Sequence, residues 1–504
     1  MSGFPVGPHD ASLLAAVHPA DWENPQPAGR YDLLVLGAGT AGLVAAAGAA
    51  GLGARVALVE RHLMGGDCLN VGCVPSKALL RAARAAADVR AAERFGVRLG
   101  GPVEVDFAAA MERLRRLRAS LAPHDSAARF RSLGVDVFLG DGRFAGRDAL
   151  EVRGRAGDRT LRFARALIAT GAHPAVPEIP GLQQAGCLTN ETVFDLVDRP
   201  ARLAVLGGGP LGCELAQAFA RLGSRVTIVQ SAARLLPRED SDAAALLAAA
   251  LARDGVQARL SATLERVERR GDVRVLHLRG GDVLQAEALL VAVGRSPQVQ
   301  GLGLDAAGVA CDPREGVCVD DRLRTSNPRI FAAGDVCSSR KFTHAADFLA
   351  RTALRNALFA GRARASALLI PHCTYTDPEV AQVGPTEEEA RAAGLRVRAF
   401  REDLAGVDRA RLDGETEGFV KVLVREGGDR LVAATIVARH AGEMLPELTL
   451  ALQTGVGLQR LGGVIHSYPT QAEAIRRLGD QWNRTRLTPR ARRWLQRWLA
   501  LRRG

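Results

Sequence analysis

Two cysteines separated by four residues are the side chains of this sequence with the most reactive chemistry. Cys68 and Cys73 belong to residues 65–77, which read GGDCLNVGCVPSK, and the Ala- and Leu-rich residues 78–83 that follow have strong helix propensity. The pair is therefore expected where a loop runs into a helix. The partial positive charge of a helix N-terminus lowers the pKa of a nearby thiol and favours the thiolate, the form that exchanges with disulfides. The spacing thus predicts a redox-active disulfide.

An internal repeat indicates which elements position this pair. An apolar run at 31–36 precedes a glycine turn, an Ala-rich helix and a second apolar run at 55–60, and the same order returns from 202–206 to 225–230. Glycines in such turns allow the backbone to approach a pyrophosphate at a helix N-terminus, and here they are Gly37, Gly39 and Gly42 in the first copy and Gly207, Gly209 and Gly212 in the second. One such turn is weak evidence, but two copies flanked by strands in the same register predict an α/β fold with two Rossmann-like dinucleotide-binding domains.

The residue that ends the second apolar run differs between the copies. Glu60 lies 23 residues after Gly37, and Gln230 lies 23 residues after Gly207. A carboxylate at this position accepts hydrogen bonds from both hydroxyls of an adenosine ribose, as FAD requires, but repels a 2′-phosphate. Neutral Gln230, with Arg234 nearby, therefore favours NADPH. NADH is the alternative, because an Arg234 that simply faces water fits the same sequence.

Residues 65–77 strongly resemble the active-site signature of the class I, FAD-dependent pyridine nucleotide–disulfide oxidoreductases, which include lipoamide dehydrogenase, glutathione reductase and mercuric reductase. Further motifs extend the resemblance over residues 31–480. The family implies FAD with NADPH or NADH as cofactors, a homodimer and a C-terminal α+β dimerisation domain. The parts expected from it are an N-terminal extension (1–30), an FAD-binding domain in two segments (31–185 and 301–368), an NAD(P)H-binding domain (186–300), the dimerisation domain (369–480) and a basic tail (481–504).

By the same resemblance, electrons pass from NAD(P)H through FAD to the Cys68–Cys73 disulfide and then to an acceptor. Cys73 lies against the flavin as a thiolate, and Cys68 is the interchange thiol. Lys77 pairs with Glu214 beside the flavin N5. The other residues that the family motifs place at the cofactors are Gly66 beside the disulfide, Gly142 at the adenine, Thr170 and Gly294 where the FAD and nicotinamide halves close, Asp335 at the ribityl chain or phosphates, and Thr343 at the pyrimidine edge of the flavin.

The C-terminal segment separates the candidate acceptors. Disulfide reductases of this family place a His-Pro pair, with a glutamate five residues after the histidine, in the partner's active site, where the histidine is the acid–base for the leaving thiol. Here Glu473 is present, but Tyr468 stands at the histidine position. Tyrosine, with a pKa of about 10, is a poor base at neutral pH. Mercuric reductases also carry a tyrosine there, so the resemblance favours a mercuric-reductase-like enzyme whose acceptor is a metal ion.

Two features leave the acceptor open between a metal ion and a small molecule. Mercuric reductases deliver Hg(II) with a cysteine pair at the extreme C-terminus, whereas no cysteine follows Cys373 here and residues 1–30 contain none. Delivery would then depend on Cys68 and Cys73 alone. The alternative is a dihydrolipoyl dehydrogenase or another disulfide reductase, in which His466, expected one strand-face position from Tyr468, supplies the proton chemistry. No resident metal ion is expected, and the other six cysteines are expected to be buried packing residues.

The positive charge of the chain is concentrated at its C-terminus. The formal net charge is +12, and residues 481–504 hold eight arginines and no acid. On a helix, Trp494, Leu495, Trp498 and Leu499 share one face, so the tail is expected to be a helix that packs on its own dimer or ends in solvent, with contact to an anionic membrane surface as the alternative. Nucleic acid is not an expected partner. A flavin-bearing redox sensor or membrane-associated module that acts through this tail is a third hypothesis for the function.

The rest of the chain predicts a water-soluble enzyme. No apolar run reaches the roughly 20 residues that span a bilayer. Residues 1–30 lack a basic segment followed by an apolar stretch, so no secretory signal is expected. The expected localisation is therefore cytoplasmic.

Overall fold

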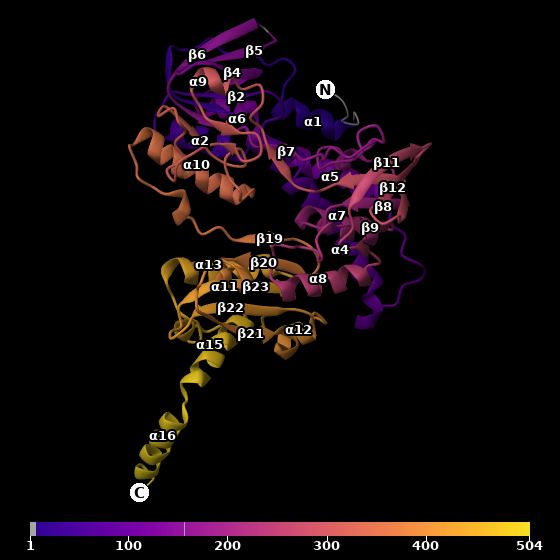
Figure 1. Ribbon diagram of the computed structural model, residues 1–504, viewed down its shortest axis with the longest axis vertical. Helices are drawn as coiled ribbons and strands as arrows, with labels where there is room; N and C mark the ends of the chain where they lie inside the picture. Colours follow the sequence, from indigo (N-terminus) through magenta and orange to yellow (C-terminus); the bar gives the residue numbers. More distant parts are fainter. Residues whose placement is uncertain (1–6, 156, 504) are drawn as a thin grey trace. The chain divides into compact units, whose positions relative to one another are not determined.

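The computed structural model describes residues 7–155 and 157–503, which divide into two compact units. The first unit comprises residues up to 231 together with 256–368, and the second comprises residues 232–255 together with those from 369 onward. Each unit is a mixed α/β structure, and Figure 1 shows its elements in chain order. None of the described helices is both long and apolar enough to cross a membrane.

A seven-stranded sheet forms the core of the first unit. Its strands run in the order β3-β2-β1-β6-β5-β4, and β18 pairs with β6. The strands are β1 (Arg30–Leu36), β2 (Val56–Glu60), β3 (Val135–Leu139), β4 (Asp141–Gly146), β5 (Ala149–Gly154), β6 (Gly157–Ile168) and β18 (Ile330–Ala332). Pairing is parallel among β3, β2, β1, β6 and β18, and antiparallel along β6, β5 and β4. Leu33 and Val35 of β1 enter one hydrophobic cluster and Leu34 and Leu36 another, so the central strand is buried on both faces.

Helices rich in small residues cover one face of this sheet. Helix α2 (Thr40–Gly51) packs against α10 (Thr343–Leu358), and their alanines join the same hydrophobic cluster. Aromatic residues make up only 4% of the chain, so Ala, Val and Leu fill the core at close backbone approach. The other helices of the unit are α1 (Pro8–Val17), α3 (Gly66–Asn70), α4 (Cys73–Arg90), α5 (Phe107–Leu121), α6 (Ala127–Ser132), α7 (Pro210–Arg221) and α9 (Leu304–Ala307), with 3₁₀ turns η1 (Ala92–Phe95), η2 (Ala122–Asp125), η3 (Val193–Asp195) and η4 (Ala365–Ala367).

A second, four-stranded parallel sheet repeats the strand–turn–helix–strand unit of the first. Its order is β10-β9-β8-β14, formed by β8 (Arg202–Leu206), β9 (Arg225–Val229), β10 (Gln257–Arg259) and β14 (Ala288–Val291), and α7 connects β8 to β9. The repeat predicted from the sequence is therefore confirmed, with β1–α2–β2 and β8–α7–β9 as its two copies. The remaining strands of the unit are β11 (Leu264–Arg270), β12 (Val273–Leu278) and β13 (Val283–Ala286), which form an antiparallel sheet, and the pairs β7 (Ala172–Pro174) with β15 (Arg295–Pro297) and β16 (Cys311–Asp312) with β17 (Gly316–Val317).

The N-terminal extension contributes a packed helix to the first unit. Leu13 and Val17 of α1 are fully buried, and the buried carboxylate of Asp10 lies 2.8 Å from Nη2 of Arg118 on α5. Arg118 is itself fully buried and also donates to the carbonyl oxygen of Asn70, the last residue of α3. The extension is therefore connected to α3, the helix that carries Cys68, through one buried arginine.

A five-stranded antiparallel sheet organises the second unit. Its order is β19-β20-β23-β22-β21, formed by β19 (His372–Thr374), β20 (Glu379–Val383), β21 (Val397–Asp403), β22 (Phe419–Arg425) and β23 (Leu431–Ala438). The helices are α8 (Ser241–Arg253), α11 (Glu387–Ala392), α12 (Asp408–Leu412), α13 (Ala441–Thr454), α14 (Leu458–Leu461), α15 (Glu473–Arg486) and α16 (Pro489–Leu501), with the 3₁₀ turn η5 (Leu404–Gly406). This architecture agrees with the α+β dimerisation domain expected from the sequence.

Ion pairs of a lysine and a hydrogen bond of a histidine attach residues 232–255 to the sheet of the second unit. Buried Lys421 of β22 lies 2.7 Å from Asp240 and 2.9 Å from Asp242, at the start of α8. His372 of β19 lies 2.9 Å from Glu239. Helix α8 thus packs in the second unit, although its sequence falls within the predicted NAD(P)H-binding domain.

Candidate active site

The two cysteines lie at the junction of α3 and α4. Cys73 is the first residue of α4 and Gly72 is the N-cap, so the predicted position of a thiol at a helix N-terminus is confirmed. Cys68 lies inside the short helix α3 rather than in a loop, which corrects the expectation for that residue. Both side chains are thiols in this structure, and their disulfide stays a prediction.

A hydrogen bond gives the two thiols different protonation states. The Cys68 thiol donates to Cys73, and this bond is the largest of the effects that lower the pKa of Cys73 to about 6. The hydroxyl of Thr343, with Oγ1 3.1 Å from Cys73 Sγ, and the charge of Lys77 lower it as well. The pKa of Cys68 is raised, because its proton is held by Cys73 and because burial disfavours its charged form. At neutral pH the pair is therefore a Cys73 thiolate beside a Cys68 thiol.

Lys77 and Glu214 form an ion pair within the first unit. Lys77 Nζ on α4 lies 2.9 Å from Glu214 Oε2 on α7, and Glu214 is only 3% exposed. A carboxylate this buried requires a charged or hydrogen-bonded partner. The pairing expected from the sequence is present, and it holds an ammonium group one helical turn from Cys73. Its place beside a flavin stays a prediction.

The first glycine turn brings the cysteine segment against the dinucleotide motif. Gly37 has φ +103°, and a Cβ added to it would overlap the carbonyl oxygen of Ala169. A Cβ on Gly42 would overlap the carbonyl oxygen of Gly37, and one on Gly66 would lie 2.7 Å from the Cα of Gly39. The β1–α2 turn and the start of α3 are therefore in backbone contact, which only glycine permits.

A cavity of about 340 Å³ opens beside this turn, where the sequence motif predicts the adenosine half of FAD. Glu60, Gly142 and Thr170 all line it. Glu60 Oε2 accepts from the backbone N–H of Ala38 at 2.6 Å, and Oε1 accepts from that of His62 at 2.8 Å, which leaves lone pairs for two ribose hydroxyls. Burial raises the pKa of Glu60 despite these two bonds. The residues that line the cavity are thus compatible with the adenosine of FAD, which the first glycine motif predicts.

Arg295 connects the cysteine segment to Asp335. Its guanidinium contacts the carboxylate of Asp67, the residue before Cys68, and its Nε lies 3.4 Å from Asp335 Oδ2. Burial raises the pKa of Asp335, which the charges of Arg295 and Lys341 oppose. Lys341 also donates to the backbone oxygen of Asp335 at 2.9 Å. Sequence reasoning selected Gly294 from this segment and missed Arg295 next to it.

A second residue that sequence reasoning missed is a carboxylate near Cys68. Asp125 Oδ2 is 3.0 Å from the position that a Cβ on Gly65 would take, and its negative charge contributes to the raised pKa of Cys68. Burial raises the pKa of Asp125 itself. No motif marks this residue, because η2 reaches the cysteine segment only through the fold.

The second glycine turn reproduces the first at the nicotinamide motif. Gly207 has φ +108°, and a Cβ on Gly212 would overlap its carbonyl oxygen, whereas a Cβ on Gly209 would meet no atom within 4 Å. Buried Gln230, directly after β9, accepts from the backbone N–H of Gly208 at 3.1 Å, the counterpart of the bond between Glu60 and Ala38. Gly294 lies at φ +133° with open space beside it.

Arg234 lies in the second unit, unlike Gln230. Its guanidinium donates to the carbonyl oxygen of Pro237 at 3.2 Å and lies 3.3 Å from Glu388. Both of these partners of the Arg234 guanidinium belong to the second unit. The predicted role of Arg234 at a 2′-phosphate is therefore an expectation that these contacts do not support.

Tyr468 and Glu473 both belong to the second unit. Tyr468 is 71% exposed, and its hydroxyl donates to Asp408 Oδ2 at 3.2 Å, which raises its pKa. Glu473 is the first residue of α15. Burial would raise the pKa of Glu473, but the hydrogen bonds and charges of Arg476 and Arg477 lower it. The tyrosine thus presents its ring to the exterior of the unit, and the glutamate is fixed at a helix start.

His466 has both ring nitrogens engaged. Nε2 lies 3.1 Å from Glu447 Oε1, Nδ1 lies 3.1 Å from the carbonyl oxygen of Val464, and the side chain is 7% exposed. The expectation that this histidine shares a strand with Tyr468 is wrong, because residues 462–472 form turns and irregular backbone. The imidazole is buried within its own unit and is not exposed beside Tyr468.

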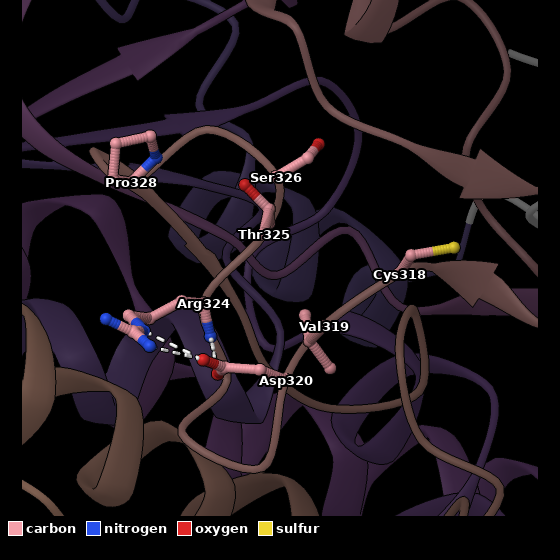
Figure 2. A pocket seen from close by; sticks show the side chains of 7 residues that line it. All are labelled: Cys318, Val319, Asp320, Arg324, Thr325, Ser326 and Pro328. Carbon is pink, nitrogen blue, oxygen red and sulfur yellow. Dashed lines mark hydrogen bonds and ion pairs between the residues drawn. The ribbon is translucent and has the colours of Figure 1, made fainter.

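The expectation that the six remaining cysteines are buried holds in full only for Cys213. Cys187, Cys337 and Cys373 are half-buried against hydrophobic clusters. Cys213 is buried, but Cys311 and Cys318 are exposed, because the β16–β17 hairpin is too short to cover them. Cys318 borders a cavity of about 400 Å³ that also contains the ion pair of Asp320 and Arg324 (Figure 2). None of the seven residues lining this cavity belongs to the predicted catalytic or cofactor set.

Two family models match the chain over most of its length. The model described as pyridine nucleotide-disulphide oxidoreductase matches residues 31–350. The model described as the dimerisation domain of the same enzymes matches residues 370–478. Together they leave out residues 351–369, the N-terminal extension and the basic tail.

Two relatives and a solved structure are similar to the chain over about nine tenths of its length. A mercuric reductase of Streptomyces lividans is 37% identical over 451 residues, which are 88% of this chain and 95% of the relative. A dihydrolipoyl dehydrogenase of Thermus scotoductus is 36% identical over 459 residues, 88% of this chain and 96% of the relative. Among solved structures, the Cu(II) complex of the HOCl-induced flavoprotein disulfide reductase RclA from Escherichia coli superimposes with a TM-score of 0.81 at 29% identity, covering 90% of this chain and 99% of that one.

Proposed function

The chain belongs to the pyridine nucleotide–disulphide oxidoreductase family of FAD enzymes that take electrons from NAD(P)H, and we propose that it passes these electrons through Cys68 and Cys73 to a soft metal ion such as Hg(II). In this reaction, one NADPH is oxidised to NADP⁺ with release of a proton, and its two electrons reduce Hg(II) to Hg(0). The substrate arrives bound to thiols, because thiolates are the ligands that soft metal ions prefer.

The residues that would hold FAD fit that cofactor. The glycine turn at residues 37–42, Glu60 at the cavity and Asp335 beside Arg295 match the positions that the family motifs give to the pyrophosphate, ribose and ribityl groups. FAD held by these residues would supply the two-electron transfer from the nicotinamide to the cysteine pair. Lys77, held by Glu214, keeps a positive charge near the Cys73 sulfur.

The protonation states of the two thiols suit metal exchange. Cys73 is a thiolate at neutral pH, and Thr343 donates a hydrogen bond to it. Cys68 keeps its proton until a ligand replaces it, and a soft metal ion displaces thiol protons on binding. Hg(II) held by Cys68 and Cys73 would release one proton from Cys68 and none from Cys73. The two carrier thiols leave Hg(II) as thiolates, one of which takes the Cys68 proton and the other a proton from water, so the exchange requires no acid–base side chain.

The engagement of His466 is the observation that carries the choice of a metal ion over a disulfide. A disulfide substrate leaves a thiolate that an acid must protonate. Tyr468 has a raised pKa, and both nitrogens of His466 are hydrogen bonded to oxygen atoms in its own unit. Neither side chain is suited to that proton transfer at neutral pH. For thiol-bound Hg(II) the proton displaced from Cys68 goes to a leaving carrier thiolate, so neither side chain is required.

Gln230 supports NADPH as the coenzyme, and the dimerisation domain supports the homodimer. Gln230 places a neutral amide where an acid would repel a 2′-phosphate, which favours NADPH. The dimerisation domain supports a homodimer, in which Tyr468 of one subunit would reach the cysteine pair of the other. The cytoplasm stays the expected location.

A dihydrolipoyl dehydrogenase is the second candidate. Glu473 is in the position that disulfide reductases use, and dihydrolipoyl dehydrogenases are among the relatives at similar identity. This candidate requires His466 to leave Glu447 and serve as the acid–base. It therefore makes the opposite prediction for a His466→Ala variant.

Variants at these positions distinguish the two candidates. NADPH oxidation is followed with Hg(II) in excess 2-mercaptoethanol and, separately, with lipoamide or dihydrolipoamide and the matching coenzyme. We expect Hg(II) turnover that is lost in Cys68→Ser and Cys73→Ser and kept in His466→Ala. We also expect that Tyr468→His raises lipoamide turnover by installing an imidazole. The control is Cys311→Ser with Cys318→Ser, which removes exposed thiols outside the site. Lipoamide turnover that is fast in the natural protein and lost in His466→Ala would replace the proposal with the second candidate.

A further inference from the structure

Helix α16 folds as a separate element at the end of the second unit. The Thr488 side chain caps it by accepting from the N–H of Ala491, and Pro489 occupies its first position. From residue 483 to 503 every residue is exposed except Ala491, which is half-buried. Figure 1 shows α16 extending beyond α15, away from the sheet of its own unit. Its shape therefore does not depend on packing against that sheet.

The apolar side chains of α16 gather on one side. At about 3.6 residues per turn, a single arc of just under half the circumference contains Leu501, Trp494, Trp498, Ala491, Leu495 and Leu499, in this order around the axis. Trp494 is 64% exposed and Leu501 is 83% exposed, so this face lacks a cover within its unit. Such a face in water is unfavourable unless a partner buries it.

The opposite side of α16 is strongly basic. Arg490, Arg492, Arg493, Arg497 and Arg503 lie outside the apolar arc, and residues 481–504 contain no acid. Arg502 falls within the arc, but its guanidinium lies 4.9 Å from the centre of the Trp498 ring. The helix thus combines a row of tryptophan and leucine with a flanking band of arginine.

Charge decides which partner can cover this face. A second copy of α16 would bury the tryptophans but bring two arginine bands together. The remainder of the chain has a net charge of about +4, because eight of its twelve net positive charges lie in residues 481–504, so it offers no excess of acid. An anionic lipid surface offers both an apolar layer for the tryptophans and phosphates for the arginines.

We propose that α16 binds flat on a bilayer that contains anionic phospholipid. The helix is about 20 Å long, and its apolar face enters the boundary between headgroups and acyl chains. Trp494 and Trp498 lie at that boundary, where tryptophan side chains are enriched. The arginines reach the phosphates on both sides. This inference does not rest on the identity of the electron acceptor.

Vesicle binding by the full-length holoenzyme tests the proposal. The protein is sedimented with vesicles of phosphatidylcholine that contain phosphatidylglycerol as about a third of the lipid, and with vesicles of phosphatidylcholine alone. Two variants separate the contributions: Trp494→Ala with Trp498→Ala keeps every charge, and Arg490→Gln with Arg493→Gln and Arg497→Gln keeps the apolar face. The matched control for charge is Arg266→Gln with Arg270→Gln and Arg279→Gln, three exposed arginines of the first unit.

The expected result is binding to the anionic vesicles and little to phosphatidylcholine alone. The tryptophan variant should bind about tenfold or more weakly, and the α16 arginine variant on the order of a hundredfold more weakly. The control variant should bind like the natural protein, and NADPH oxidation should be unchanged in all variants. Absence of binding to anionic vesicles would overturn the proposal. Binding that is insensitive to the tryptophan substitutions and equally strong to a DNA duplex would also overturn it, because α16 would then be a general polyanion-binding segment. Loss of the dimer in the tryptophan variant would overturn it as well.

Discussion

Replacing Thr343 with valine tests the hydrogen bond that stabilises the Cys73 thiolate. Thr343 Oγ1 lies 3.1 Å from Cys73 Sγ, at the start of α10. The hydrogen bond of Thr343 lowers the pKa of Cys73 less than the bond from Cys68 does, but more than the charge of Lys77 does. Valine has nearly the same shape as threonine but lacks the hydroxyl, so the substitution removes the donor and little else.

The expected shift is about one pKa unit. A hydrogen bond to a charged group contributes about 1.5–3 kcal/mol to stability, and we take the lower end because Cys73 and Thr343 are only half-buried. One pKa unit corresponds to about 1.4 kcal/mol. Loss of the donor disfavours the thiolate, so the pKa of Cys73 should rise from about 6 towards 7. At pH 6 the thiolate fraction should fall from about one half to about one tenth.

Alkylation of individual cysteines measures this shift without relying on turnover. The holoenzyme is reduced, treated briefly with iodoacetamide over a series of pH values, and digested, and the modification of Cys73 is quantified by mass spectrometry. The midpoint of the rate should move to higher pH in Thr343→Val and stay near the natural value in Thr343→Ser, which keeps the hydroxyl. An unchanged midpoint in the valine variant would show that Thr343 does not stabilise this thiolate.

Three further predictions concern neighbouring parts of the same unit. Asp10→Ala leaves buried Arg118 without its carboxylate and should lower the free energy of unfolding by about 3–5 kcal/mol. The double variant Asp10→Ala with Arg118→Met should recover much of this loss. Equal stability of the two variants in urea would argue against a coupled pair. Asp125→Asn removes a negative charge that raises the pKa of Cys68, so that pKa should fall and alkylation of Cys68 at a fixed pH should become faster; a slower rate would reverse the assigned sign. Gly42→Ala places a Cβ against a backbone oxygen of the glycine turn, so the purified protein should lose its yellow FAD colour. Full retention of FAD would show that the turn does not hold the cofactor.

Local patterns in the sequence were sufficient to predict the dinucleotide turns and the start of α4. Gly42 has a fixed role because its missing Cβ leaves room for the carbonyl oxygen of Gly37, five residues earlier in the same turn. Cys73 could be placed at a helix N-terminus because the helix-forming residues follow it directly. In both cases the physical requirement lies within a short stretch of chain, so spacing alone reveals it.

Contacts between distant segments could not be predicted in this way. Asp10 and Arg118 meet because α1 packs on α5, and neither residue stands in a recognisable pattern. Cys311 and Cys318 were expected to be buried because free cysteine usually is, but a hairpin of two-residue strands cannot cover them. The contact of Arg295 with Asp67 likewise depends on the pairing of β15 with β7, which the sequence does not show.

The same limit applies to the side chains that distinguish the candidate acceptors. The sequence placed Tyr468 and Glu473 in register with a family motif, and the structure shows each in a defined environment. It could not show that Glu447 engages His466, because that contact joins α13 to an irregular segment. Tyr468 already favoured a metal ion in the sequence, and the contacts of His466 are a further argument for that proposal which only the fold provides.

The most direct test of the proposed function is the stoichiometry between NADPH and elemental mercury. The reduced coenzyme is mixed anaerobically with the holoenzyme and a limiting amount of Hg(II) bound to 2-mercaptoethanol, and the volatile Hg(0) is collected while NADPH absorbance is followed. We predict one atom of Hg(0) for each NADPH oxidised, with both signals absent in Cys68→Ser and unchanged in His466→Ala. Oxidation of NADPH without release of Hg(0), or turnover with lipoamide alone, would contradict a metal ion as the acceptor.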